Sequence, residues 1–337
     1  MKILITGATG FIGRNLAIAL RDHGHEVRAL VRPASVAQLP KGITPIQDDL
    51  AHPTQLSDTL QDTQTVYHLA AVRDQWGVPY QVYRQVNVEG TRALLQAAAA
   101  GDVRRFIYCS SVGVAEYPGK LDADETLPHH WERSKHNYHH TKALAEDLTL
   151  EYAREKQLAT TVVRPCITYG PGDTWGMIPR MAAMLARGRY VMAGAGRNHI
   201  HLAYIDDVVQ GFLLAGECEQ AIGQPYILVG PAPIRMADLV ARLCDVLQVT
   251  PPRWRLPAAP LWLAGALLEV VYTIKNRLGI KALGQVPFLT RSKVDTVTLD
   301  SAFSAAKARA ELGYQPRVDY DEGLQRTVEW CRAHDFL

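Results

Sequence analysis

Short apolar runs alternate with helical patterns through the first half of the chain. The runs are rich in β-branched residues and are separated by segments with a helical period, which is typical of parallel strands covered by helices on both faces. We predict an α/β fold with a doubly wound parallel sheet of the Rossmann type. The predicted strands span residues 3–5, 27–31, 66–69, 106–109 and 160–163, and the two long helices span about 80–100 and 136–156.

The alternation fades after Pro171, where prolines and glycines become frequent. We predict that residues 1–173 form the sheet domain and that 200–218, which begin with the apolar run 202–205, return to it. Residues 174–199 and 219–337 are predicted to form mainly a smaller, mixed substrate lobe. Two helices should close the chain, over about 304–312 and 320–334, with Gly313 placed to end the first.

Composition and charge are those of an ordinary globular protein, with 47% hydrophobic residues, 21% charged residues and a net charge of +2. Nearly balanced charge gives no long-range attraction for a phosphate polymer, so nucleic acid is not an expected partner. The five cysteines are scattered without C-x-x-C spacing, and the apolar run after Lys2 is too short for a secretory signal. We therefore expect a reducing, cytoplasmic location.

The most apolar stretch spans residues 256–274. Pro257 and Pro260 near its start and Glu269 inside it argue against a membrane span, which needs roughly 20 predominantly apolar residues. Two interpretations stay open: a buried helix of the substrate lobe, which we slightly favour, or contact with a membrane surface through 256–277. In the second, Lys275, Arg277 and Lys281 would meet anionic head groups.

A glycine-rich loop directly follows the first predicted strand and opens into a helical pattern. Glycines let the backbone turn sharply and approach a pyrophosphate, while the helix N-terminus offers unpaired N–H groups. The position between strand and helix favours dinucleotide binding over a tight structural turn. The loop reads Thr6-Gly7-Ala8-Thr9-Gly10-Phe11-Ile12-Gly13.

Two further positions bear on the cofactor. Arg32 stands at the end of the second strand, where an acidic residue normally binds the ribose 2′-hydroxyl, and a guanidinium suits the 2′-phosphate of NADP. NADP is therefore the predicted cofactor and NAD the alternative, in which Arg32 would only stack on adenine; Arg14 is a second candidate for the phosphate. Asp49, after the third strand, is predicted to accept the adenine amino group, or else to cap the next helix.

Tyr138 and Lys142 are four residues apart and therefore share one helix face. An unperturbed tyrosine titrates near pH 10, so we expect the Lys142 ammonium to lower the pKa of Tyr138 and also to reach the cofactor ribose. Ser110 and Ser111 follow a predicted strand and should lie at the carboxyl edge of the sheet, where open α/β sheets bind ligands. Ser111 is predicted to hold a substrate oxygen against Tyr138; the alternative is a serine pair that caps a turn.

These features occur together in an order that resembles the extended short-chain dehydrogenases/reductases of the NAD-dependent epimerase/dehydratase superfamily over nearly the whole chain. Further matching stretches, in chain order, are Asp49-Leu50, His68-Leu69-Ala70-Ala71, Asn87-Val88-Glu89-Gly90-Thr91, Arg164-Pro165, Tyr169-Gly170-Pro171-Gly172 and Tyr204-Ile205-Asp206-Asp207.

The resemblance implies roles for individual residues. It implies that Asn87 supports a catalytic group of Ser111, Tyr138 and Lys142, and that the two long helices pair across a homodimer. The cofactor-binding residues expected from the motifs and the resemblance are Gly7, Thr9, Gly10, Phe11, Ile12, Gly13, Arg32, Asp49, Leu50, Leu69, Ala70, Ala71, Tyr138, Lys142, Pro165 and Ile167.

Within that family the chain is most similar to the 3β-hydroxysteroid dehydrogenase and sterol-carboxylate dehydrogenase group. The resemblance implies interconversion of a secondary alcohol and a ketone on a bulky, lipid- or sterol-like molecule; Arg32 departs from the group's acidic residue, and NADP would favour reduction. The stretches that carry it are Tyr108 to Ala115, Gly196-Arg197-Asn198, Leu289-Thr290-Arg291, Lys307-Ala308-Arg309 and Leu312-Gly313-Tyr314-Gln315-Pro316.

Three alternatives remain. A nucleotide-sugar epimerase/dehydratase shares the motifs, but many carry Arg-Asp where this chain has Ile200-His201, which removes a cation for the diphosphate. A dinucleotide-binding sensor or scaffold would be expected to lose Tyr138, Lys142 or Ser111. Metal binding is not predicted, because the histidines at 129, 130, 136, 139 and 140 lack a partner at ligand spacing. Trp76 and Tyr80 either line the pocket or only pack.

Overall fold

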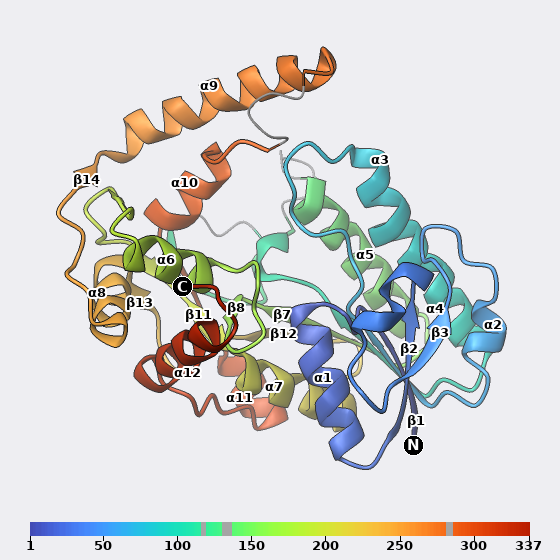
Figure 1. The fold of residues 1–337 in the computed structure, drawn as a ribbon. Helices are drawn as coiled ribbons and strands as arrows, with labels where there is room; N and C mark the ends of the chain where they lie inside the picture. The colour runs from blue at the N-terminus through green and yellow to red at the C-terminus, as the bar shows by residue number, and fades with distance from the viewer. Residues whose placement is uncertain (116–118, 130–136, 281–285) are drawn as a thin grey trace.

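The fold is centred on a seven-stranded, wholly parallel sheet (Figure 1). The structure is a computed structural model that describes residues 1–115, 119–129, 137–280 and 286–337. The strand order is β12-β7-β5-β4-β1-β2-β3, so the predicted doubly wound sheet is confirmed. Its strands are β1 (Lys2–Thr6), β2 (Glu26–Val31), β3 (Thr44–Gln47), β4 (Thr65–His68), β5 (Arg105–Cys109), β7 (Thr160–Pro165) and β12 (Pro225–Leu228).

Helices cover both faces of this sheet, which is why the residues of its central strands are buried on both sides. Alternate residues of β1 point to opposite faces: Ile3 and Ile5 pack in one buried cluster and Leu4 in the other. The first cluster includes residues of α1 (Phe11–Asp22) and α7 (Ile205–Glu217). The second includes residues of α4 (Gly90–Ala100) and α5 (Asn137–Arg154).

The long helix predicted over 80–100 is present but is not a uniform α-helix. It begins as α3 (Tyr80–Tyr83), passes through a π-helical segment, η2 (Arg84–Glu89), and continues as α4. A π-helical turn accommodates extra backbone within a helix and is frequent at functional sites. Here it carries Asn87, whose side chain is buried.

The second half builds small sheets and helices beside the main sheet. A four-stranded sheet has the order β13-β10-β15-β6, and two parallel pairs join β11 to β8 and β14 to β9. These strands are β6 (Lys120–Ala123), β8 (Ile167–Tyr169), β9 (Met192–Ala193), β10 (His199–Ile200), β11 (Leu202–Tyr204), β13 (Ile234–Arg235), β14 (Arg255–Leu256) and β15 (Ser301–Phe303). The remaining helices are α2 (Leu56–Thr59), α6 (Met177–Ala186), α8 (Met236–Leu247), α9 (Ala258–Arg277), α10 (Arg291–Thr298), α11 (Ala306–Leu312) and α12 (Tyr320–Ala333); η1 (Pro33–Gln38), η3 (Val112–Val114) and η4 (Glu219–Ala221) are short 3₁₀ turns.

Two expectations about the second half need correction. The run 202–205 adds no strand to the main sheet, because β11 pairs with β8; within 200–218 it is α7 that packs against β5 and β7 of the main sheet. The strand that joins the main sheet is β12, from a range assigned mainly to the substrate lobe. The two closing helices are confirmed, and Gly313 ends α11 with a left-handed φ of 69°.

Candidate active site

The glycine loop is pressed against the end of β4. Gly7 has a φ of 76°, and a Cβ there would lie 2.7 Å from the backbone N of Ala70. A Cβ on Gly13, in the first turns of α1, would lie 2.2 Å from the carbonyl oxygen of Gly7. Both approaches are too close for any side chain, so the compact strand–loop–helix arrangement requires glycine at these two positions.

This arrangement fits a dinucleotide diphosphate. Gly10 is the N-cap of α1 and is exposed. Because glycine has no side chain, Gly10 offers no side-chain acceptor to the first N–H groups of the helix. Such a helix end attracts a phosphate through its N–H groups and its partial positive charge. Thr9, Phe11 and Ile12 around the loop and Leu69, Ala70 and Ala71 after β4 are all partly exposed.

A buried hydrogen-bond chain runs from the glycine loop to the helix that carries Tyr138. Thr6 Oγ1 contacts His68 Nδ1 at 2.7 Å, and His68 Nε2 contacts Thr91 Oγ1 at 2.8 Å. The Thr91 hydroxyl donates to the carbonyl oxygen of Asn87, and Asn87 Nδ2 donates to Thr141 Oγ1 at 3.1 Å. Burial lowers the pKa of His68 to about 3, so this ring bridges the strands as a neutral imidazole.

Asn87 also fixes the loop that follows β4. Its Oδ1 accepts a hydrogen bond from Val72 N at 2.7 Å, and its Nδ2 donates to Val72 O at 3.2 Å. The structure thus places Asn87 between the loop and α5.

Tyr138 and Ser111 come together at the carboxyl edge of the sheet. Ser111 lies two residues after the end of β5, is the N-cap of η3, and accepts a hydrogen bond from Gly113 N at 3.2 Å. Tyr138 lies in the first turn of α5 and is half-buried, and the Ser111 side chain is near enough to lower the pKa of its phenol. Two neighbouring hydroxyls at this edge can both reach a single substrate oxygen.

The expected effect of Lys142 on Tyr138 is not what the structure shows. Burial is the main influence on Tyr138 and raises its pKa well above the ordinary value, while Ser111 and Arg73 oppose that shift. The Lys142 ammonium instead donates to the carbonyl oxygen of Cys109 and lies 4.1 Å from the centre of the Tyr108 ring. Burial lowers the pKa of the Lys142 amine to about 8.

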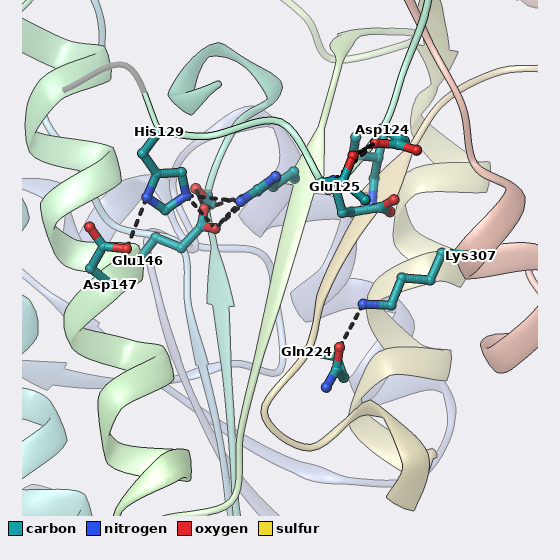
Figure 2. Close-up of polar contacts among 11 residues, drawn as sticks. Asp124, Glu125, His129, Glu146, Asp147, Gln224 and Lys307 are labelled. Atoms are coloured by element: carbon teal, nitrogen blue, oxygen red, sulfur yellow. Dashed lines mark hydrogen bonds and ion pairs between the residues drawn. The ribbon is translucent and has the colours of Figure 1, made fainter. Parts of the chain in front are cut away.

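A buried ion pair behind the site was missed at the sequence level. Glu146 lies one turn after Lys142 on α5, and its Oε1 is 2.5 Å from Nη2 of Arg164 on β7. The hydroxyl of Ser110 donates to Oε2 at 2.5 Å. Figure 2 shows His129 between Glu146 and Asp147, at 3.1 Å and 2.9 Å from their carboxylate oxygens. The sequence signal was a carboxylate four residues after Lys142, on the same face of the predicted helix.

The charges in this cluster support one another. Despite its burial, the pKa of Glu146 is lowered to about 2 by the His129 and Arg164 partners. The pKa of His129 is raised to about 9 by Asp147 and Glu146, against the opposing effect of burial. Glu146 thus faces both the Arg164 guanidinium and the His129 ring, whose Nη2 and Nε2 lie 2.9 Å apart.

Other predicted site residues lie around these groups. Arg32 is exposed at the end of β2, whereas Arg14 donates to the carbonyl oxygen of Gln38 at 3.0 Å. Asp49 Oδ1 accepts from Ala51 N at 2.9 Å, and the neighbouring Asp48 holds the turn before α2. Leu50 is buried under Gly90, Pro165 ends β7, and Ile167 begins β8.

The structure describes only part of the histidine run between residues 129 and 140. His130 and His136 lie outside the described residues. Of the other three, His129 belongs to the buried ion-pair cluster, while the rings of His139 and His140 pack against Tyr138 and Tyr80, with centroids 5.4 Å apart in both pairs. Over the ranges that the structure describes, no three His, Cys, Asp or Glu residues are grouped to hold a metal ion.

Comparison with known proteins gives consistent results. The model of the NAD dependent epimerase/dehydratase family matches residues 3–229. A 2-alkyl-3-oxoalkanoate reductase from Stenotrophomonas maltophilia is 31% identical, over 97% of this chain and 98% of its own length. A 3 beta-hydroxysteroid dehydrogenase/Delta 5-->4-isomerase from Mycobacterium tuberculosis is 30% identical, over 98% and 90%. The crystal structure of gox2253 superimposes with a TM-score of 0.81 at 31% identity and covers 99% of both chains.

The buried ion pair predicts a large and specific loss of stability. Glu146→Leu should lower the free energy of unfolding by about 3–5 kcal/mol, because it leaves the Arg164 guanidinium charged and buried without its partner. The measurement is urea unfolding at pH 7. The control, Asp321→Asn, breaks the exposed pair with Arg242 at 2.6 Å and should change the midpoint little. Equal effects of the two substitutions would contradict this account.

Proposed function

The chain belongs to the NAD dependent epimerase/dehydratase family, and from this premise we propose that it is an NAD(P)-dependent oxidoreductase that interconverts a secondary alcohol and a ketone on a bulky, lipid-like substrate. The observation that carries the proposal is the placement of Ser111, after β5, and Tyr138, in the first turn of α5, with the Ser111 hydroxyl near enough to the phenol to oppose the rise of its pKa. The names of the two relatives, a reductase of oxoalkanoates and a hydroxysteroid dehydrogenase, support this reaction class.

In the proposed mechanism, the substrate oxygen takes hydrogen bonds from the Ser111 and Tyr138 hydroxyls. Tyr138 Oη delivers a proton to this oxygen in reduction and removes it in oxidation, as general acid or base. The nicotinamide, when bound, supplies or accepts the hydride. Lys142 and Asn87 position the helix that carries Tyr138. Lys142, four residues after Tyr138 on this helix, is also the proposed cation for the cofactor ribose.

Reduction is the proposed direction. Because burial raises the pKa of Tyr138, its phenol holds its proton at neutral pH and is ready to donate to a developing alkoxide. Oxidation would need the phenolate, which the same burial disfavours. This agrees with the cofactor proposed below, since NADPH commonly serves reduction.

A nucleotide-sugar substrate is disfavoured by His201. Its side chain is buried, with Nε2 at 3.2 Å from Gly230 O and Nδ1 accepting from Phe303 N at 3.3 Å. Burial lowers its pKa to about 4, so the ring stays neutral at pH 7. Ile200, which stands where many epimerases carry the arginine, is buried and uncharged, so neither position supplies a cation for a diphosphate.

We propose that the substrate carries a carboxylate as well as an apolar body. The Arg73 and Arg180 guanidinium groups both lie 5.8 Å from the ring centre of Trp175, which is 62% exposed. Arg73 is close enough to Tyr138 to oppose the rise of its pKa. An exposed aromatic ring flanked by two exposed arginines suits an acid with a hydrocarbon part.

NADP is the proposed dinucleotide, and Arg32 its selector. The Arg32 side chain is exposed beyond β2 and, within the part of the chain that the structure describes, makes no hydrogen bond or ion pair. It is therefore available for a 2′-phosphate, whereas Arg14 is engaged by Gln38. The homodimer through the long helices also remains a proposal, which rests on the resemblance.

Removing the Tyr138 hydroxyl tests the mechanism. Tyr138→Phe should lower kcat by at least about 100-fold, a general acid/base contribution, while dinucleotide binding and the unfolding midpoint stay near wild type. The assay follows NADPH oxidation with cyclic and long-chain ketones. Tyr152→Phe, later on the same helix, serves as the control and should keep full activity. A Tyr138→Phe enzyme with normal turnover would refute the mechanism.

Cofactor choice is tested by charge reversal. Arg32→Glu should reduce kcat/KM with NADPH by at least about tenfold, because a charge-assisted contact to phosphate is lost. The value with NADH should be unchanged or higher. Arg14→Gln is the comparator and should have a smaller effect. If the ratio of kcat/KM with NADPH to kcat/KM with NADH is unchanged in Arg32→Glu, Arg32 has no role in cofactor selection.

The substrate carboxylate has its own test. Arg73→Gln should raise KM for a long-chain 3-oxo acid by about tenfold or more and leave KM for the corresponding neutral methyl ketone unchanged. Arg84→Gln, which removes an exposed guanidinium paired with Glu89, controls for net charge. Equal changes with acid and ketone would show that Arg73 does not bind the carboxylate.

A further inference from the structure

Helix α9 leaves a continuous apolar face uncovered. Its exposed residues recur every three or four positions, so they form one stripe along the helix. In Figure 1, α9 runs along the outside of the molecule, remote from the main sheet, with α10 beneath it. The expectation of a buried helix is therefore wrong. The stripe consists of Leu263, Leu267, Val270, Ile274 and Leu278, which are 60%, 68%, 57%, 52% and 69% exposed.

The opposite face of α9 is held by the protein. Gly265 lies so close to α10 that a Cβ would be 2.9 Å from the backbone carbon of Thr290, and Tyr272 is buried. The Glu269 carboxylate accepts from Arg291 N at 2.8 Å and pairs with Nη2 of Arg291 at 2.7 Å. By length and composition α9 is the one described helix that could cross a membrane, but a helix bound along one side and anchored by an ion pair is suited to lie in the membrane plane.

The charged residues on and beside α9 indicate which kind of surface would bind its apolar stripe. The sole acidic residue of α9 is Glu269, and it is turned inward to Arg291. Exposed basic residues flank the helix at both ends, Arg253 and Arg255 before it and Arg277 in its last turn. Trp254, 75% exposed, stands beside the first two, as aromatic residues do at the boundary between head groups and acyl chains.

A second copy of the chain fits this surface poorly. Because both ends of α9 are basic, pairing two copies of the helix in either direction brings arginines against arginines. An anionic lipid surface satisfies both the apolar stripe and the basic ends. We propose that α9 docks in the plane of an anionic membrane surface, with its apolar stripe in the acyl boundary and its arginines among the head groups. This proposal does not depend on the reaction proposed above.

Docking would place the membrane next to the active-site loop. The ring of Tyr272, on the inner face of α9, meets the ring of Trp76 edge to face with centroids 6.0 Å apart. Trp76 lies in the loop that Asn87 fixes through Val72. A lipid-like molecule leaving the membrane at α9 would therefore meet this loop first.

Vesicle flotation of the purified full-length chain tests the proposal. Wild type should bind vesicles of phosphatidylcholine with phosphatidylglycerol, and bind phosphatidylcholine alone at least about tenfold more weakly. Leu267→Glu should weaken binding to the mixed vesicles at least about tenfold, because a carboxylate replaces an apolar contact. The matched control is Leu121→Glu on β6, where the native leucine is 58% exposed, and it should bind like wild type.

Three results would overturn the proposal. They are no binding of wild type to the mixed vesicles, equal binding to both lipid compositions, and equal losses in Leu267→Glu and Leu121→Glu. Sedimentation velocity without lipid tests the rival occupant: a wild-type dimer that Leu267→Glu alone dissociates would assign the stripe to a second copy. Turnover of a short-chain soluble ketone should be unchanged in Leu267→Glu, which confirms an intact active site.

Discussion

The active site depends on the buried ion pair between Glu146 and Arg164. It joins the helix that carries Tyr138 and Lys142 to β7, the neighbour of β5, whose end provides Ser110 and Ser111. The same carboxylate binds the Ser110 hydroxyl, so one side chain sets helix, strand and serine loop relative to one another. Burying two charges costs desolvation free energy that an apolar contact between the same two elements would not. Here the benefit is alignment of two hydroxyls at the sheet edge.

A second linkage, made of uncharged side chains, fixes how closely the glycine loop approaches the end of β4. Thr6, His68 and Thr91 connect β1, β4 and α4 through hydrogen bonds between buried side chains. Because burial keeps His68 uncharged, this linkage places no unpaired charge in the interior of the protein. The glycines and this linkage therefore act together: glycine permits the close approach of loop and strand, and the threonine–histidine contacts hold it.

Local pattern predicted much of the fold, and its failures have physical causes. The strands of the first half have uniform apolar runs, and their helices are long, so period and turn residues identified them. β12 was missed because it is a four-residue strand that begins with Pro225 and lies outside the regular alternation. The run 202–205 was correctly read as extended, but period does not specify the partner, which is β8 and not the main sheet.

The residues of the candidate site were likewise predicted only in part. Tyr138 and Ser111 were found because helical spacing and a strand end mark them, whereas Asn87 was expected only from the family resemblance; the structure links Asn87 to the Tyr138 helix through Thr141. The Glu146–Arg164–His129 cluster joins three segments whose proximity no local pattern encodes. The pKa of Tyr138 was misjudged because helical spacing places Lys142 on the same face but does not show where its ammonium points, which is toward the Cys109 carbonyl.

Helix α9 shows how composition alone can mislead. An apolar segment in the middle of a chain is usually part of a core, and on that basis burial was the favoured interpretation. Its Glu269 decides otherwise, because the carboxylate faces Arg291 and the leucines are left outside. In a helix that served only as a core element the polar group would point to water and the apolar stripe inward. The inverted orientation suits an outer medium that is itself apolar, as in the proposed docking of α9 on a lipid surface.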